Sequence, residues 1–342
     1  MSKTLNDPRI DPRLKAVFGG FEIAPLSNVS SREELLEIEY APERLAANEG
    51  LTQFMNSFDD EAIIPSAGLR ITRETIVSSP DGNRINLQII RPDTDEVLPC
   101  VYYIHGGGMM YCSCFDGNYR AWGRMIAHQN VVVVMPDFRN ALQPSSVSEN
   151  APYPAGLNDC ASGLEWVRDN AGAIGADPAR IVIAGESGGG NLTLALALRL
   201  NKQGKSDSIK GVYALCPIIA GEWPHPDHPS TIENDGIFLN VANNRIVHAY
   251  GIEAWNARDP QAWPGMAEAS DVQGLPPVVI SVNECDPLRD EGIAFYRLLL
   301  QNNVPARARI ILGTTHGTEV FPTICPEISR DAARDIAALA RS

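Results

Sequence analysis

The sequence has few basic residues for its length. Of its 342 residues, 28 are lysine or arginine and 42 are aspartate or glutamate, which gives a formal net charge of −14. Binding to nucleic acid needs a basic surface that contacts phosphates, so we expect no nucleic-acid partner. An anionic surface would mildly repel acidic substrates, although net charge says little about any single pocket.

Long apolar runs are also missing. Runs such as Val131–Pro136 are far shorter than the roughly 20 residues that a helix needs to cross a bilayer. The first residues, Met-Ser-Lys-Thr-Leu-Asn-Asp-Pro, are too polar for the apolar region of a signal peptide. We therefore expect no membrane partner and a cytoplasmic location.

The seven cysteines form neither a disulfide framework nor a metal-binding pattern. Their number is odd, and most lie in apolar stretches, as Cys160 and Cys216 do, which is typical of reduced core thiols. Cys112 and Cys114 form a C-x-C pair, but no second pair has the spacing of metal ligands. We expect no bound metal and no cofactor.

From residue 70 onward, short apolar runs alternate with longer helical patterns. The expected strands are residues 70–77, 84–91, 99–104, 131–135, 181–184, 211–215, 277–282 and 308–312. The expected helices are residues 117–129, 156–171, 188–203, 288–302 and 326–341. This alternation predicts an α/β fold with a mainly parallel sheet that is covered by helices on both faces.

Two segments fall outside the alternation. The start of the chain is mixed and contains acidic helical stretches, and a proline-rich insertion with a helix near residues 241–250 separates two core strands. We expect these segments to form a helical cap. The expected divisions are an N-terminal cap segment at 1–69, a first core part at 70–217, a cap insertion at 218–268 and a second core part at 269–342.

A G-x-S-x-G motif places Ser187 between an apolar strand and a helix. The motif reads Gly-Glu-Ser-Gly-Gly, it follows Ile-Val-Ile-Ala, and a helical pattern starts just after it. This strand-turn-helix setting is the one that a nucleophile elbow needs, because a sharp turn exposes the serine hydroxyl and the helix directs its positive end at the reacting centre. Alone, the motif would also fit a glycine-rich turn that merely opens a helix. In this setting Ser187 is the candidate nucleophile.

A second glycine-rich stretch, His-Gly-Gly-Gly at residues 105–108, follows another apolar strand. Glycines allow a loop to turn its N–H groups towards a ligand, as an oxyanion hole requires. A phosphate-binding loop is the alternative, but no lysine follows and no G-x-G-x-x-G frame is present. The expected oxyanion donors are the N–H groups of Gly106, Gly107 and Gly188. We expect the residues beside these donors to contact the substrate: His105, Gly108, Met109 and Glu186.

A base and an acid must follow the nucleophile in this arrangement, the acid first. The histidines after Ser187 are His225, His228, His248 and His316. The first three fall in the proline-rich insertion, whereas His316 follows the last expected strand, where a loop at the carboxyl edge of the sheet would lie. His316 is therefore the candidate base.

The candidate acid lies after the strand at 277–282. Asp286 is favoured, although an aspartate before proline is also a natural helix N-cap. Glu284 is the rival, two residues closer to the strand. Asp290 and Glu291 fit a simpler role as complements to the helix dipole. The acid would accept the imidazole N–H, fix its tautomer and stabilise the imidazolium.

Together these stretches resemble the hormone-sensitive-lipase family of α/β-hydrolases. The resemblance rests on His-Gly-Gly-Gly, Gly-Glu-Ser-Gly-Gly-Gly-Asn-Leu and Asp-Pro-Leu-Arg-Asp-Glu-Gly in this order, and it extends from about residue 70 to the C-terminus. It implies an eight-stranded sheet with a cap, and ester hydrolysis without a cofactor by Ser187, Asp286 and His316. Met109 stands where many members carry an aromatic residue, so it bears on the acyl pocket, and Gly188 stands where alanine is commoner.

These observations predict a serine carboxylesterase that hydrolyses short- to medium-chain or lactone-type esters through an acyl-enzyme. Its partner would be a small-molecule ester, and a homo-oligomer is compatible with the sequence. An amidase or a lactonase could use the same triad, and a non-catalytic ligand receptor could share the fold. We expect activity to rise through a pKa near the ordinary histidine value of about 6.5.

Overall fold

The computed structural model describes residues 2–342. Its strands are β1 (Leu69–Val77), β2 (Arg84–Pro92), β3 (Leu98–Ile104), β4 (Val132–Asp137), β5 (Ala176–Glu186), β6 (Gly211–Leu215), β7 (Val278–Cys285) and β8 (Ala306–Thr315). Its α-helices are α1 (Lys3–Asn6), α2 (Pro12–Phe18), α3 (Arg32–Glu39), α4 (Pro42–Asn56), α5 (Gly117–Ala127), α6 (Ala155–Asp169), α7 (Gly188–Lys202), α8 (Ser230–Glu233), α9 (Arg245–Tyr250), α10 (Ile252–Asn256), α11 (Ala269–Val272), α12 (Arg289–Gln301) and α13 (Pro326–Arg341). Short 3-10 helices occur at Ser206–Ser208, Pro264–Met266 and Thr318–Val320.

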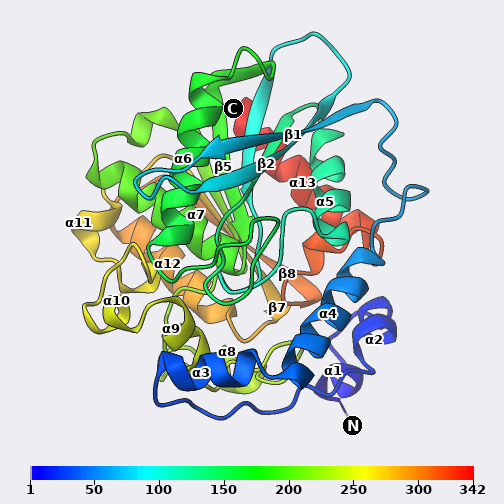
Figure 1. Ribbon diagram of the computed structural model, residues 1–342, viewed down its shortest axis with the longest axis vertical. Coiled ribbons are helices and arrows are strands. Elements are labelled where there is room, and N and C mark those ends of the chain that lie inside the picture. The colour runs from blue at the N-terminus through cyan, green and yellow to red at the C-terminus, as the bar shows by residue number, and fades with distance from the viewer. Residues whose placement is uncertain (1) are drawn as a thin grey trace.

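The strands form one eight-stranded sheet in the order β1-β2-β4-β3-β5-β6-β7-β8 (Figure 1). Strand β2 pairs antiparallel with β1 and β4, and every other pair of neighbours is parallel. Parallel strands end at the same edge of a sheet, so the loops after β3, β5, β7 and β8 lie near one another. Every candidate catalytic residue belongs to one of these loops.

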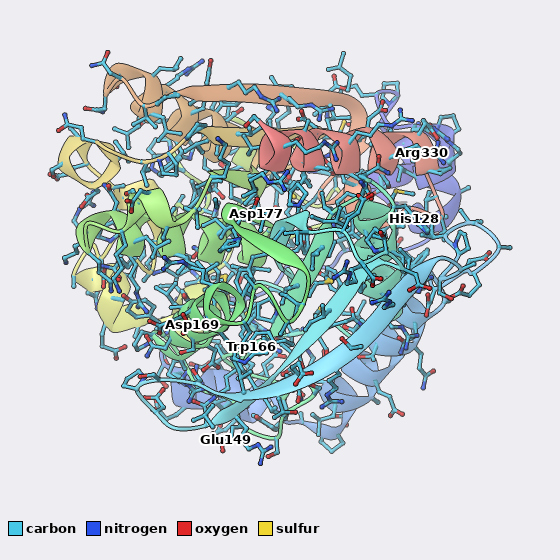
Figure 2. All side chains as sticks on the ribbon, turned by 90° about the horizontal axis from the view of Figure 1, so that it is seen from above. His128, Glu149, Trp166, Asp169, Asp177 and Arg330 are labelled. Carbon is cyan, nitrogen blue, oxygen red and sulfur yellow. The ribbon has the colours of Figure 1, made fainter. Side chains whose placement is uncertain are left out.

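The two faces of the sheet carry separate hydrophobic cores. Tyr102 and Ile104 of β3 pack in one core with residues of α6, α7 and α12. Val101 and Tyr103, which alternate with them along the strand, pack in the other core with residues of α5 and α13. Figure 2 shows α6 and α13 on opposite sides of the sheet. Burial on both faces explains why these strands read as continuous apolar runs.

Helices α1 to α4, before β1, and helices α8 and α9, between β6 and β7, lie at the same end of the sheet, with α3 beside α9 (Figure 1). Side-chain contacts join the two segments although they are far apart in sequence. Arg9 contacts Glu233 and Asn234, and Val29 and Asn244 exchange hydrogen bonds of 2.8 and 2.9 Å. The division of the chain into core and cap parts stays a prediction.

All expected strands and core helices occur, with small shifts at most ends. The largest differences are in β5, which begins at Ala176, and in β8, which runs past Leu312 to Thr315. His316 therefore follows the last strand directly. Among residues 2–342 no helix has both the length and the apolar character needed to cross a membrane.

Candidate active site

Ser187 occupies a sharp turn between β5 and α7. Its backbone has φ 56° and ψ −119°, a conformation that L-residues rarely adopt. The turn brings β5, β3 and the start of α7 so close that flanking side chains have no room. A Cβ atom on Gly185 would lie 2.6 Å from the Ile104 carbonyl oxygen, and one on Gly189 would lie 2.0 Å from it. The glycines on both sides of the motif are thus required by close backbone approach.

His316 and Asp286 form a buried hydrogen-bonded pair. The His316 Nδ1 atom lies 2.8 Å from Asp286 Oδ2, and both side chains are almost fully shielded from solvent. Asp286 Oδ1 also accepts a hydrogen bond of 2.9 Å from the Leu288 N–H. Asp286 is not the helix N-cap that its place before proline also suggested, because α12 begins at Arg289 with Leu288 as N-cap. One carboxylate oxygen instead closes a local turn, and the other lies against the histidine.

The rival acid Glu284 faces a different neighbour. Its Oε2 atom accepts a hydrogen bond of 2.7 Å from the Gly313 N–H on β8. Glu284 therefore ties the end of β7 to β8. Of the two candidate acids, Asp286 is the one hydrogen-bonded to His316.

The electrostatic surroundings raise the pKa of His316 above its ordinary value. Burial alone would lower the pKa, because it disfavours the charged imidazolium, but the charge and hydrogen bond of Asp286 outweigh burial. Glu186 and Glu319 add to the increase. A base with this pKa titrates above 6.5, so the acid limb of the activity profile is expected at higher pH than the ordinary histidine value indicates.

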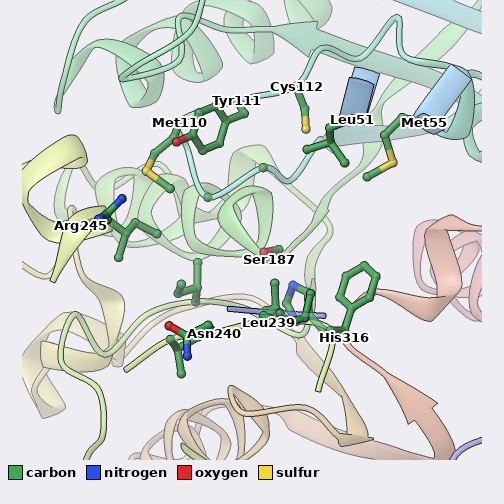
Figure 3. Close-up of a pocket in the computed structure, with 18 of the residues that line it drawn as sticks. Leu51, Met55, Met110, Tyr111, Cys112, Ser187, Leu239, Asn240, Arg245 and His316 are labelled. Carbon is green, nitrogen blue, oxygen red and sulfur yellow. The ribbon is translucent and has the colours of Figure 1, made fainter. Parts of the chain in front are cut away.

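Ser187 and His316 line one cavity of about 520 Å³, a size typical of small-molecule sites (Figure 3). Its wall also includes Gly107, Gly108 and Glu186. Much of the remaining wall comes from the helices before β1 and from the segment between β6 and β7. Members of these two groups are Phe18, Leu35, Leu51, Phe54, Met55, Trp223, Phe238, Leu239, Val241 and Ile246.

The glycine loop corrects one expected oxyanion donor. The Gly106 N–H donates to Glu186 Oε1 at 2.7 Å and to the Tyr119 hydroxyl at 3.1 Å, so it is already engaged within the protein and is not free to bind an oxyanion. Gly107 and Gly108 have φ values of 89° and 62°, which turn the loop after Gly106. Both line the cavity beside Ser187. Gly108 therefore replaces Gly106 in the candidate set of donors.

Gly188 lies directly against this loop. A Cβ atom at this position would lie 2.5 Å from the Met109 nitrogen and 2.8 Å from Gly108 Cα. The glycine found where alanine is commoner thus fits the close contact between the elbow and the loop. As the first residue of α7, Gly188 has an N–H with no acceptor inside its own helix, which keeps it in the candidate set.

Two of the expected substrate contacts are wrong. His105 is fully buried and stacks on Phe138 with ring centroids 4.3 Å apart, and it does not line the cavity. Met109 is 1% exposed and packs in the core, whereas Met110 lines the cavity. Met109 also has a positive φ of 58°, at the turn that follows the glycines. Gly108 and Glu186 do reach the cavity wall.

Glu186 is a buried anchor beneath the glycine loop. Besides the Gly106 N–H, its carboxylate accepts hydrogen bonds from the hydroxyls of Tyr103 and Tyr119. Burial raises the pKa of Glu186 to about 7, although these hydrogen bonds oppose the rise. The residue that precedes Ser187 thus fixes the loop that carries the candidate oxyanion donors.

Glu291 has a role that the dipole interpretation missed. It is 2% exposed, and it accepts hydrogen bonds from the N–H groups of Ile219 and Ala220 and from Trp223 Nε1, at 3.0 to 3.2 Å. Burial raises the pKa of Glu291 to about 8. A sequence signal existed, because helical spacing places this position on the same face as Phe295 and Leu299, which are buried.

Cys216 completes the one cluster among residues 2–342 whose ligand atoms are close enough to hold a metal ion. Its sulfur, an Asp286 oxygen and a His316 nitrogen all lie within 4.8 Å of one another. Burial raises the pKa of the Cys216 thiol and so favours the neutral form over the thiolate that binds metals. Since Asp286 and His316 are already hydrogen-bonded to each other, this chemistry fits an acid–base pair better than a metal centre.

Comparison with known proteins gives a consistent result. Residues 101–320 match the sequence profile of the α/β-hydrolase fold. The structure is similar to that of the esterase Est22, with a TM-score of 0.96 and 56% identity over 99% of this chain and 100% of that one. It is also similar to brefeldin A esterase, described as a bacterial homologue of human hormone-sensitive lipase, with a TM-score of 0.87 and 35% identity over 98% of this chain and 94% of that one. Esterase LipI of Mycobacterium tuberculosis (strain ATCC 25618 / H37Rv) is 29% identical over 313 residues, which cover 88% of this chain and 92% of the relative.

Proposed function

The chain belongs to the hormone-sensitive-lipase family of α/β-hydrolases and is a carboxylic ester hydrolase, and we propose that it acts through an acyl-enzyme on Ser187. One observation carries the proposal. The 2.8 Å pair of His316 and Asp286 opens onto the same cavity as a serine held in a strained elbow. Within residues 2–342, His316 is the one histidine that lines that cavity.

In the first half of the reaction His316 acts as general base. Its Nε2 atom takes the proton from the Ser187 hydroxyl as the oxygen attacks the ester carbonyl carbon. Asp286 accepts the Nδ1–H, so the imidazole keeps the correct tautomer and the imidazolium is stabilised. The carbonyl oxygen gains the negative charge, and the N–H groups of Gly107, Gly108 and Gly188 would stabilise it.

The tetrahedral intermediate then collapses. The C–O bond to the alcohol breaks, and the imidazolium returns its proton to the leaving oxygen. In the second half, His316 removes a proton from water, which attacks the acyl-enzyme through a second oxyanion. Ser187 leaves with that proton, and the carboxylic acid product dissociates.

Substrate size follows from the enclosure of the cavity. Its volume of about 520 Å³ and its wall of helices before β1 and between β6 and β7 suit small or medium esters, including lactones, better than emulsified fat. We assign residues 1–69 and 218–268 to a cap on this basis, with the core at 70–217 and 269–342. The hydrogen bonds between Val29 and Asn244 support treating the two cap parts as one unit.

A series of p-nitrophenyl esters from acetate to laurate tests the proposal, with Ser187→Ala beside the wild type. We expect the variant to lose on the order of 10⁶ in kcat and the wild type to prefer short chains. Matched ester, amide and lactone substrates separate the esterase from an amidase or lactonase. If the wild type and Ser187→Ala are both folded and neither hydrolyses any of the esters, the catalytic role of Ser187 is contradicted and a receptor function is favoured.

Two further expectations remain predictions. All seven cysteines are free thiols, which is consistent with a reducing compartment such as the cytoplasm. Homo-oligomer formation is best tested by the molar mass of the protein in solution. Neither changes the chemistry at Ser187.

A further inference from the structure

The cavity differs in character on the two sides of Ser187. On the side of His316 the wall is apolar, with Leu51 and Met55 above it (Figure 3). On the other side Figure 3 shows Tyr111 and Arg245. An apolar acyl or alkyl chain needs only the first kind of wall, so the polar side calls for a separate explanation.

A buried carboxylate organises the polar side. Glu39, at the end of α3, is 2% exposed and still lines the cavity. Its Oε2 atom accepts hydrogen bonds from Arg44 Nε at 2.9 Å and from the Tyr111 hydroxyl at 2.8 Å. Its Oε1 atom lies 3.8 Å from Arg245 Nη1. Two arginines thus share one carboxylate, and all three side chains line the cavity.

The two arginines keep unused donor capacity. Arg44 donates its Nε–H to Glu39 and also lies against the Tyr111 hydroxyl, and Arg245 donates its Nε–H to the Ser27 carbonyl. A guanidinium carries four further N–H groups, which suit a planar carboxylate. Arg245 is the better shielded of the two, since its side chain is 15% exposed whereas that of Arg44 is 38% exposed.

The charge of this group is positive. Glu39 offsets one of the two guanidinium charges, which leaves the group of Glu39, Arg44 and Arg245 with one positive charge in a protein whose net charge is −14. Glu22 also lines the cavity, but it lies on the exposed loop after α2 and already has an interaction partner. A partly buried cation without a full counter-charge is unfavourable unless an anion joins it.

We propose that Arg44 and Arg245 bind a second carboxylate on the substrate, so that the preferred esters carry an anionic group remote from the bond that is cleaved. The proposal rests on ester hydrolysis at Ser187. Half-esters of dicarboxylic acids place the anion on the acyl side, and acetate esters of hydroxy acids place it on the alcohol side. Glu39 acts as a positioning residue that holds both guanidinium groups toward the cavity.

The test uses two series of substrates. The first series compares monoethyl esters of dicarboxylic acids of increasing length with ethyl esters of equal length that end in a methyl group. The second series compares acetylated hydroxy acids with acetylated alcohols of equal length. In at least one series, we expect the wild type to hydrolyse the anionic ester with a kcat/KM about 10- to 100-fold higher than that of the matching neutral ester. The increase should come from a lower KM and should be greatest at one chain length. Added salt reduces that preference, because it screens the attraction.

Three variants separate recognition from structural damage. Arg245→Met should remove most of the preference, whereas Arg245→Lys keeps the charge without the planar fork and should retain part of it. Arg330→Met removes an exposed arginine on α13 (Figure 2) and should leave the preference unchanged. The melting temperature of each variant shows whether the fold is intact.

Two results would overturn the inference. Equal kcat/KM for anionic and neutral esters in both series of the wild type contradicts it, as does an equal loss on both kinds of ester in Arg245→Met. Hydrolysis of p-nitrophenyl acetate is measured beside them. If the wild type cleaves p-nitrophenyl acetate but shows no preference for anionic esters, the proposed carboxylate site is contradicted and ester hydrolysis is supported. If the wild type does not cleave p-nitrophenyl acetate, the proposed function itself is contradicted.

Discussion

The cavity has a floor and a roof that are built in different ways. The floor consists of Ser187, His316 with its buried partner Asp286, and the glycines Gly107 and Gly108, which all follow strands of one sheet. The roof consists of the cavity-lining residues before β1 and between β6 and β7, which lie on the 15-residue helix α4, on shorter helices and on loops. Backbone ladders position the floor, whereas long-range side-chain hydrogen bonds hold much of the roof.

This difference separates chemistry from selection. Groups at the ends of packed strands keep their geometry whichever ester is bound, so a change in the floor should alter kcat for all esters alike. Loops and short helices are where proteins vary without loss of the fold. A change in the roof should instead alter which ester is preferred, or the stability of the closed cavity, with less effect on kcat.

The largest effect is expected from Asp286→Asn in the floor. The amide keeps the shape but no longer stabilises the imidazolium or fixes the tautomer, so kcat should fall on the order of 10⁴-fold. The loss should be the same for p-nitrophenyl acetate and butyrate. Glu284→Gln is the matched control, since that carboxylate bonds to Gly313, and it should stay near the wild-type kcat. A larger loss in the control than in Asp286→Asn would reassign the acid.

Glu186→Gln should have the next largest effect. The amide must replace a carboxylate that accepts from the Gly106 N–H and two tyrosine hydroxyls, so the glycine loop should shift. A displacement of about 1 Å in catalytic groups lowers kcat by up to about 100-fold, and here we expect 10- to 100-fold with little change in KM. Steady-state kinetics on two esters shows whether the substitution changes kcat or KM. A change in KM alone would mean that Glu186 affects substrate selection, as the roof residues do, rather than the chemical step.

The smallest effect concerns the roof and is read from stability. The pKa of Glu291 is raised to about 8 in the folded protein but stays near 4.3 in the unfolded chain. Between about pH 4 and pH 8 the Glu291 carboxyl group is deprotonated in the unfolded chain but still protonated in the folded protein. This group therefore lowers the free energy of unfolding progressively as the pH rises from about 4 to above 8. The melting temperature should therefore fall less between pH 6 and pH 9 in Glu291→Gln than in the wild type.

Glu149→Gln serves as the control for that measurement, because this glutamate is exposed on the surface (Figure 2). It should follow the wild-type pH dependence. If Glu291→Gln lowers kcat for every ester as strongly as Glu186→Gln does, the separation between floor and roof is wrong.

The apolar runs and glycine motifs of the sequence were enough to predict the sheet and most of the floor. Ser187 and His316 could be singled out because each directly follows a strand, and the end of an apolar run marks where a strand ends. Gly106 was assigned wrongly, since the direction of its N–H depends on Glu186 in another strand. Met110 rather than Met109 lines the cavity. Met109 has a positive φ, and at a position without glycine the sequence gives no sign of such a turn.

The roof could not be predicted in the same way. Its contacts join residues more than 200 positions apart, such as Val29 with Asn244 and Ser27 with Arg245. Nothing local in either segment indicates the other, because the hydrogen bonds use common polar side chains. The charged group at Glu39, Arg44 and Arg245 likewise exists only once the two segments meet.

The split origin of the roof also sets an order of events during synthesis. At roughly 5 to 20 residues per second, the ribosome makes the segment that ends near residue 56 roughly 10 to 45 s before it completes the segment between β6 and β7. Buried side chains of that first segment, such as Leu14 and Leu35, have no complete partner surface in the meantime. His316 is made later still, so the nascent chain can bind no ester productively until almost the whole polypeptide has left the ribosome.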